Sequence, residues 1–215
     1  TGGEAGVVGA EHLARRHGTP LTLLLWPALM AVRSYVTPRF AAAIMAVLLG
    51  ATAVAVMTSP HETSKLALIV GLAAWLVTRY LPRVALPTMQ VSWAAACLLV
   101  VPMSIGLHEA GLHKQKWLQF SARHRIEIWN YSARETLAAP LFGNGAMTTY
   151  AKIESVRPDQ RSYLTPPHQH NVFLQVWNEL GVIGAMLLLA LGWRFLGVIA
   201  GLAPRLQPYA YAFMA

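Results

Sequence analysis

Charged residues are scarce in this chain: they make up 12% of its 215 positions, whereas hydrophobic residues make up 55% and the mean hydropathy is +0.44. A soluble domain carries about 25% charged residues. The composition therefore excludes an ordinary soluble protein and predicts an integral membrane protein. The net charge of +8 is typical of membrane proteins whose basic loops lie against anionic lipid. Since the chain has no RNA- or DNA-binding motif, we expect no nucleic-acid partner.

Cysteine is represented by Cys97 alone, which excludes an intrachain disulfide. The Cys/His spacings that hold metal ions are absent, so we expect no metal site. The chain also has no initiator methionine, no signal peptide, no internal repeat and no low-complexity tract, and a new apolar run begins at Tyr209. We expect it to be a piece of a longer polytopic protein.

Long apolar runs are present instead. A hydrocarbon core of roughly 30 Å needs about 20 helical residues, and five stretches come near that length: 20–32, 40–57, 66–77, 86–107 and 171–203. These unbroken runs lack the alternation of barrel strands, so the predicted fold is all-α, a polytopic transmembrane helical bundle. We divide it into transmembrane helices with short loops over 1–107, a large loop over 108–169, and a further transmembrane helix with the start of another over 170–215.

Basic residues predict the orientation. Six arginines fall on alternate connections, whereas the turn over 58–64 has no Lys or Arg and is therefore expected outside; the arginines are Arg33, Arg39, Arg79, Arg83, Arg194 and Arg205. The same alternation places the 108–169 loop outside. Its eight Lys and Arg residues do not contradict this, because loops of about 60 residues escape the rule. Within it, residues 125–139 predict a helix lying on the membrane surface or on the bundle, ended by Pro140 and the glycines after it.

His170 and Asn171 place an imidazole and a carboxamide at the mouth of the last long apolar run. A helix from Asn171 to about Arg205 is longer than the hydrocarbon core, so its first turns are expected to stand above the membrane. The positive end of its dipole would then face the space in which a lipid-linked phosphate lies. The alternative is that His170 only caps the helix or bonds to a loop carbonyl.

Polar side chains follow on one stripe of that helix: Asn171, Gln175 and Asn178, with Glu179 beside it. We expect these groups to turn inward. Gly181 and Gly184 are expected to let another helix approach closely. Glu179 has a structural alternative, as the partner of a loop arginine.

Basic side chains outside this helix could bind phosphate. Arg125 opens the loop helix and can present a bidentate fork, although most loop arginines are solvated or paired with a carboxylate. Arg157 and Arg161 carry the same prediction. Lys65, in the outer turn, could act as a point charge on phosphate, or as an ordinary interfacial anchor.

The chain resembles the O-antigen ligase and O-antigen polymerase family in three motifs. These are His170-Asn171 followed after nine residues by Gly181-x-x-Gly184, a preceding Arg125-x3-Trp129, and the sequence Pro-Leu-Phe-Gly-Asn-Gly over 140–145. The resemblance extends from about residue 41 to 202. Lys65 stands where arginine is common in that family.

This resemblance implies a glycosyltransferase of the bacterial inner membrane, with a periplasmic active site and no cofactor. Such enzymes move a glycan from undecaprenyl diphosphate to lipid A-core in a ligase, to another lipid-linked repeat in a polymerase, or to protein in an O-oligosaccharyltransferase. By the resemblance, Arg125 with Lys65 would bind the diphosphate. His170 would orient or deprotonate the acceptor hydroxyl, or contact the leaving phosphate, and Asn171 and Gln175 would hold sugar or imidazole.

A transporter or channel subunit is the alternative from another class, since an intramembrane polar stripe can line a solute path. A transporter is expected to show broken helices and ionisable groups near the midplane. The polar groups here gather at the outer end of the helix instead, which favours an enzyme.

Overall fold

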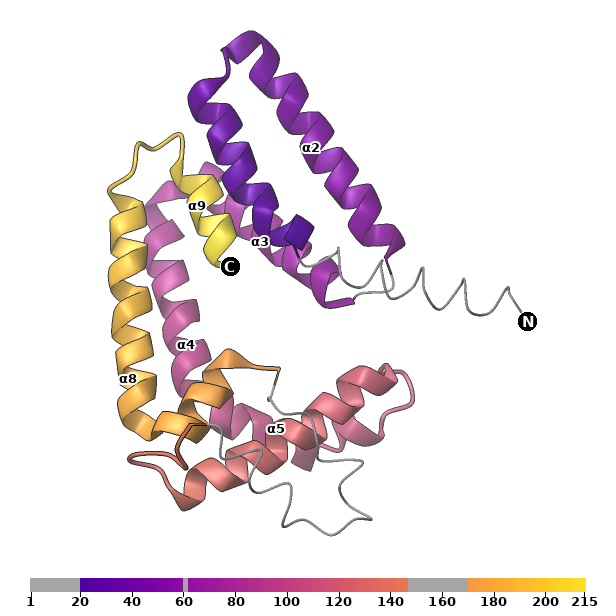
Figure 1. The fold of residues 1–215 in the computed structure, drawn as a ribbon, viewed down its shortest axis with the longest axis vertical. Coiled ribbons are helices and arrows are strands. Elements are labelled where there is room, and N and C mark those ends of the chain that lie inside the picture. The colour runs from indigo at the N-terminus through magenta and orange to yellow at the C-terminus, as the bar shows by residue number, and fades with distance from the viewer. Residues whose placement is uncertain (1–19, 60–61, 147–169) are drawn as a thin grey trace, which may run out of the picture. The chain divides into compact units, whose positions relative to one another are not determined.

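The computed structural model describes residues 20–59, 62–146 and 170–215, and all regular structure within them is helical. Figure 1 shows the order of the helices along the chain. After helical residues 20–35 come α2 (Pro38–Thr58), α3 (Glu62–Tyr80), α4 (Pro82–Glu109), the 3₁₀ turn η1 (Leu112–Lys114), α5 (Phe120–Ala138), α8 (Val172–Ala200) and α9 (Gln207–Met214). The all-α prediction is confirmed for these residues.

Three helices in the described part of the chain are long and apolar enough to cross a membrane: α2, α4 and α8. Only 17–28% of the most apolar window of each is buried inside the protein, so most of that surface is available to lipid. The other two expected spans are helical, but within the described residues neither reaches this standard. The first is described as helix over residues 20–35, and the 19 residues of α3 include Glu62, Lys65 and Arg79.

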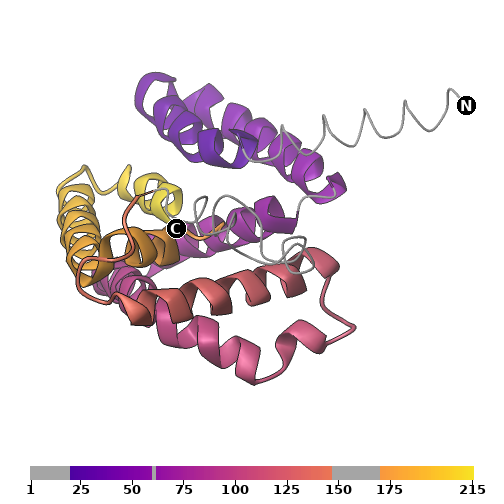
Figure 2. The same ribbon diagram turned by 60° about the horizontal axis from the view of Figure 1, so that its bottom comes forward.

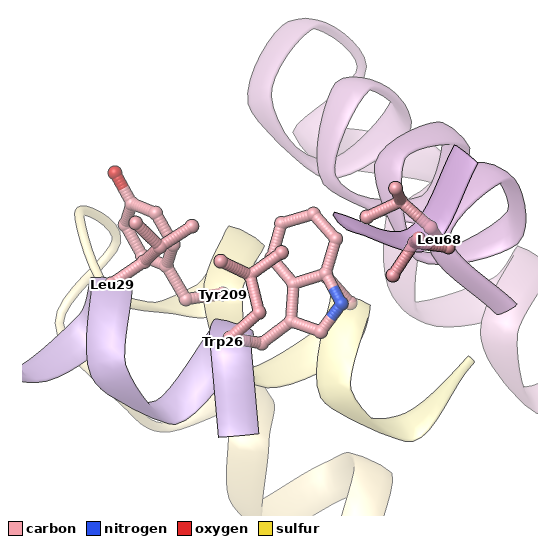
Figure 3. Packing of buried hydrophobic residues seen from close by; sticks show 7 residues of the cluster. Trp26, Leu29, Leu68 and Tyr209 are labelled. Atoms are coloured by element: carbon pink, nitrogen blue, oxygen red, sulfur yellow. The ribbon is translucent and has the colours of Figure 1, made fainter. Parts of the chain in front are cut away.

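The chain divides into two compact units, and each has its own core. The first unit comprises Thr1–Met89 and Phe195–Ala215. Its core joins helical residues 20–35 to α2, α3 and α9, and Figure 3 shows Trp26, Leu29, Leu68 and Tyr209 packed within it. The indole of Trp26 lies against Gly71, where an added Cβ would stand 2.7 Å from its Nε1 atom. A larger residue at this position would displace the ring that anchors the core.

The second unit is Gln90–Arg194. In both views α4 lies beside α8 (Figures 1 and 2). Two indole groups join these helices: Trp177 Nε1 donates to the Cys97 carbonyl at 2.6 Å, and Trp93 Nε1 donates to the Leu188 carbonyl at 3.2 Å. In an apolar environment such bonds satisfy the indole donors and set the two helices in register.

Helix α5 confirms the predicted loop helix, although it begins at Phe120, five residues earlier than expected. It packs on the bundle, because its Ala133 shares an apolar cluster with Val100 and Val101 of α4 and Leu174 of α8. Trp129 contributes to the edge of that cluster. Of the two locations expected for this helix, the structure therefore shows contact with the bundle.

Helix α8 differs from the single unbroken helix expected from Asn171 to about Arg205. It ends at Ala200 and is broken at Gly181, which has non-helical angles of φ 63° and ψ −157°. The early end follows from Gly201 and Pro204, residue types that commonly follow a helix. Gln207 supports it by donating through Nε2 to the carbonyls of Ala200 and Leu202, each at 2.9 Å.

Candidate functional site

Asn171 is the residue that caps the N-terminus of α8. Its Oδ1 accepts hydrogen bonds from the backbone N–H groups of Phe173 at 3.1 Å and Leu174 at 3.2 Å. These are two of the four N–H groups that a helix start leaves without a helical partner. Asn171 therefore supplies a side-chain cap for α8.

His170 lies immediately before this cap and is exposed. Its φ of 52° makes it the one non-glycine residue with positive φ in the described part of the chain. Histidine is among the residues that tolerate the left-handed region better than most, yet the conformation is uncommon and is over-represented at functional sites. The imidazole is thus carried by a backbone conformation that most other residue types disfavour.

The polar stripe on the first turns of α8 is mostly used within the protein. Gln175 Nε2 donates to Glu179 Oε1 at 3.1 Å, and both side chains are half-buried. Asn178 is buried, and its Nδ2 donates to the Ser132 carbonyl of α5 at 3.2 Å. The stripe turns inward as expected, and its last member ties α8 to α5.

The break at Gly181 frees backbone groups that an unbroken helix would have paired, and residues 140–145 take them up. The N–H of Val182 donates to the Pro140 carbonyl at 2.8 Å. In return, the carbonyl of Asn178 accepts the N–H of Asn144 at 2.7 Å, and the carbonyl of Glu179 accepts that of Gly145 at 3.0 Å. We call residues 140–145 the splice loop. Each freed group named here is satisfied, which a membrane protein requires wherever lipid surrounds it.

Two glycines make this contact possible. A Cβ on Gly143 would lie 2.5 Å from the Glu179 carbonyl carbon, and one on Gly181 would collide with the backbone of Leu141. Gly181 also needs the region of positive φ with extended ψ that is essentially restricted to glycine. The expectation that Gly181 serves simple helix-on-helix packing is therefore wrong, because it accommodates a loop inside a helix break.

The splice loop is the part of the site that the sequence did not reveal. Its Pro-Leu-Phe-Gly-Asn-Gly sequence predicted the end of the preceding helix and formed part of the family resemblance, but it did not predict a contact with α8. Asn144 adds a side-chain bond, from Nδ2 to the Glu135 carbonyl at 3.2 Å. The available signal was the presence of glycine both in this loop and in the interior of a long apolar helix, where glycine is otherwise costly.

Arg125 lies on the first half of α5, in the same unit as His170, and is half-buried. It stands four residues before Trp129 and seven before Ser132, so it shares their face of the helix. That face packs against α8, since Ser132 bonds to Asn178 and Trp129 contacts the shared cluster. The structure thus gives α5 and the start of α8 a common, bonded framework that carries both proposed catalytic residues.

Three predicted substrate contacts remain: Lys65, Arg157 and Arg161. Lys65 belongs to the first unit, where its Nζ forms an ion pair with Glu62 Oε1 at 2.9 Å. Arg157 and Arg161 lie outside the described residues. Their roles stay predictions.

A family model described as O-antigen ligase matches residues 43–189, well over half of the chain. The chain belongs to the O-antigen ligase family. The matched range includes every candidate site residue together with the splice loop and Gly181.

Curated relatives agree with the O-antigen ligase assignment. A protein of Rickettsia conorii is 30% identical over 62% of this chain and 34% of its own length. One of Rickettsia felis is 35% identical over 36% of this chain and 20% of its own length. One of Rickettsia typhi is 36% identical over 35% of this chain and 20% of its own length. All three carry the name "Putative polysaccharide ligase". The chain thus spans between a fifth and about a third of the relatives it matches. No solved structure matches it significantly.

Proposed function

We propose that this chain is the part of an O-antigen ligase that carries a periplasmic active site of the bacterial inner membrane. The enzyme would move a glycan from undecaprenyl diphosphate to lipid A-core. The observation that carries the proposal is the start of α8: an exposed His170 in a strained conformation, directly before a capped helix, in a chain of the O-antigen ligase family. A strained polar residue held by a well-bonded framework is a frequent arrangement at functional sites.

The transfer breaks the bond between the anomeric carbon of the glycan and the diphosphate oxygen, and forms a bond from that carbon to an acceptor hydroxyl oxygen. The acceptor proton leaves with a base, and undecaprenyl diphosphate departs as the anion. His170 has the chemistry to take that proton, because imidazole titrates near neutral pH. It could equally contact the departing phosphate.

The departing diphosphate needs positive charge. Arg125 would supply a bidentate fork on the face of α5 that packs on α8, and the N-terminal dipole of α8 adds to it. Lys65, Arg157 and Arg161 are proposed as further contacts to the substrate. Since the oxygen of Asn171 is used in the cap, its Nδ2 group is the part left to hold sugar or imidazole. Gln175, paired with Glu179, would support the same position.

An O-antigen polymerase or a protein O-oligosaccharyltransferase would use the same donor chemistry, and the acceptor alone separates these from a ligase. One feature expected of a transporter, a broken helix, is present, because α8 is broken at Gly181. However, the groups released by that break bond to the splice loop, and Asn178 bonds to α5. Polar groups consumed inside the protein do not favour a solute path, so we retain the enzyme.

The test is glycan transfer from purified undecaprenyl-diphosphate donor to lipid A-core by the full-length protein in liposomes. His170→Gly removes the imidazole and accepts the φ of 52°, so the backbone should be undisturbed. We expect transfer to fall about 100-fold at unchanged membrane abundance, the low end for a lost acid or base.

Two substitutions at the same position separate the possible roles. His170→Asn tolerates the left-handed conformation but carries no titratable proton, so it controls for backbone strain. His170→Gln can replace a hydrogen bond but not a proton carrier, and partial activity would indicate a purely orienting role. Near-normal transfer by the glycine variant would remove His170 from the mechanism.

A further inference from the structure

A cavity of about 350 Å³ lies within the first unit, and none of the residues that line it is proposed for glycan transfer. Three arginines from separate parts of the chain line it: Arg33 near the end of helical residues 20–35, Arg79 in the last turn of α3, and Arg205 between α8 and α9. Two aromatic rings, Trp75 and Tyr209, contribute to the wall with centroids 6.3 Å apart. The cavity is thus both strongly basic and aromatic.

No carboxylate neutralises these arginines within the described residues of the first unit. Glu62 is the one acidic side chain there, and it pairs with Lys65 at 2.9 Å. It begins α3, whereas Arg79 stands in the last turn, about 25 Å further along the helix. Three arginines therefore line one space without a counter-ion from this part of the protein.

Two neutral polar side chains of the wall, Thr78 and Gln207, already have partners. Thr78 Oγ1 donates to the Ala74 carbonyl at 2.8 Å, and Gln207 Nε2 donates to the carbonyls of Ala200 and Leu202 at 2.9 Å each. Guanidinium groups offer donors and no acceptor. A ligand of this cavity must therefore supply several oxygen acceptors. It must also carry more than one negative charge, or one charge delocalised over those oxygens. A phosphate group meets both conditions.

We propose that this cavity binds the phosphate of an anionic phospholipid. The lipid source is favoured by depth, because the cavity lies where α3 ends and α4, a membrane-spanning helix, begins at Pro82. Helix ends of this kind stand at the level of the lipid head groups, where tryptophan and tyrosine also gather. Leu76, Leu81 and Val84 are exposed near the same helix ends and offer apolar surface to acyl chains.

The site is distinct from the proposed donor site. Arg205 follows the C-terminal end of α8, whereas His170 precedes its N-terminal end. On the orientation proposed above, the cavity faces the cytoplasmic leaflet. A lipid bound there would hold the ends of helical residues 20–35, α3 and α9 together without taking part in transfer.

The experiment measures phosphatidylglycerol binding to the purified full-length protein by native mass spectrometry. Arg33→Gln, Arg79→Gln and Arg205→Gln are combined in one variant. The control combines Arg39→Gln, Arg83→Gln and Arg194→Gln, which remove the same charge from exposed arginines outside the cavity. We expect affinity to fall by about tenfold or more in the cavity variant and to stay within about twofold in the control.

A milder pair guards against misfolding of the triple variant. Arg79 and Arg83 are both exposed, so Arg79→Lys and Arg83→Lys should fold alike, and only the first should weaken binding, since lysine keeps the charge but loses the fork. Equal losses in cavity and control variants, or no loss in either, would overturn the proposal. Displacement of the lipid by equimolar inorganic phosphate, dependent on the same arginines, would assign the site to soluble phosphate and overturn the lipid assignment.

Discussion

Replacing Gly181 by alanine tests the contact between the splice loop and α8. Alanine at φ 63° and ψ −157° costs on the order of 1–3 kcal/mol in backbone strain. The added Cβ would also stand 2.6 Å from the backbone nitrogen of Gly143, so the loop must move. If one or two of its bonds to α8 are lost, at about 0.5–1.5 kcal/mol each, the total reaches roughly 1.5–6 kcal/mol.

The measurement is the thermal unfolding of the purified full-length protein, followed by tryptophan fluorescence. A loss of that size corresponds to an apparent Tm lower by roughly 5–15 °C. Gly106→Ala is the matched control, because Gly106 lies in α4 of the same unit with nothing within 4 Å of an added Cβ. Alanine should leave stability unchanged or raise it there. A Gly181→Ala protein that melts within about 2 °C of the wild type would refute the contact as a source of stability.

Three further predictions concern the site and its orientation. Asn171→Asp keeps a capping oxygen and loses the Nδ2 group, so Tm should hold while transfer falls if the amide contacts substrate; full activity would make Asn171 a cap only. Arg125→Lys keeps charge but not the fork, and transfer should drop about tenfold or more at normal abundance, whereas unchanged transfer would make Arg125 a bystander. Gln115→Cys should react with an impermeant thiol reagent from the periplasm and Leu81→Cys should not. The native Cys97 is buried and should not react in either variant. The reverse labelling pattern would show that the topology is opposite to the one proposed.

The composition and the long apolar runs were sufficient to predict a helical membrane protein, because burial in lipid leaves few alternatives to the helix. Residues 125–139 predicted a loop helix, and Pro140 with the glycines after it predicted its end, both of which α5 confirms. The His-Asn and Gly-x-x-Gly spacing indicated the family. These features are local or compositional, so they can be recognised without knowing which segments meet.

The break in α8 could not be predicted in this way. Apolar periodicity continues through Gly181, and helix propensity alone tolerates a single glycine at a cost of about 1 kcal/mol. The break is stable because the splice loop, over thirty residues earlier in the chain, supplies N–H and C=O groups at the required positions. The glycines in each segment are a signal of an irregular backbone, but they do not show that two segments so far apart in the sequence meet.

The sequence by itself thus determined the membrane class, the helices, the family and the residue types available for phosphate chemistry, since each follows from composition or spacing. The tertiary structure decided how those residues are used. In it Asn171 caps α8, Asn178 bonds to α5, and Gly181 forms the helix break that contacts the splice loop. Three arginines, Arg33, Arg79 and Arg205, line one cavity. The reason is that a side chain's role depends on the group that reaches it from elsewhere in the chain, and only packing brings the two together.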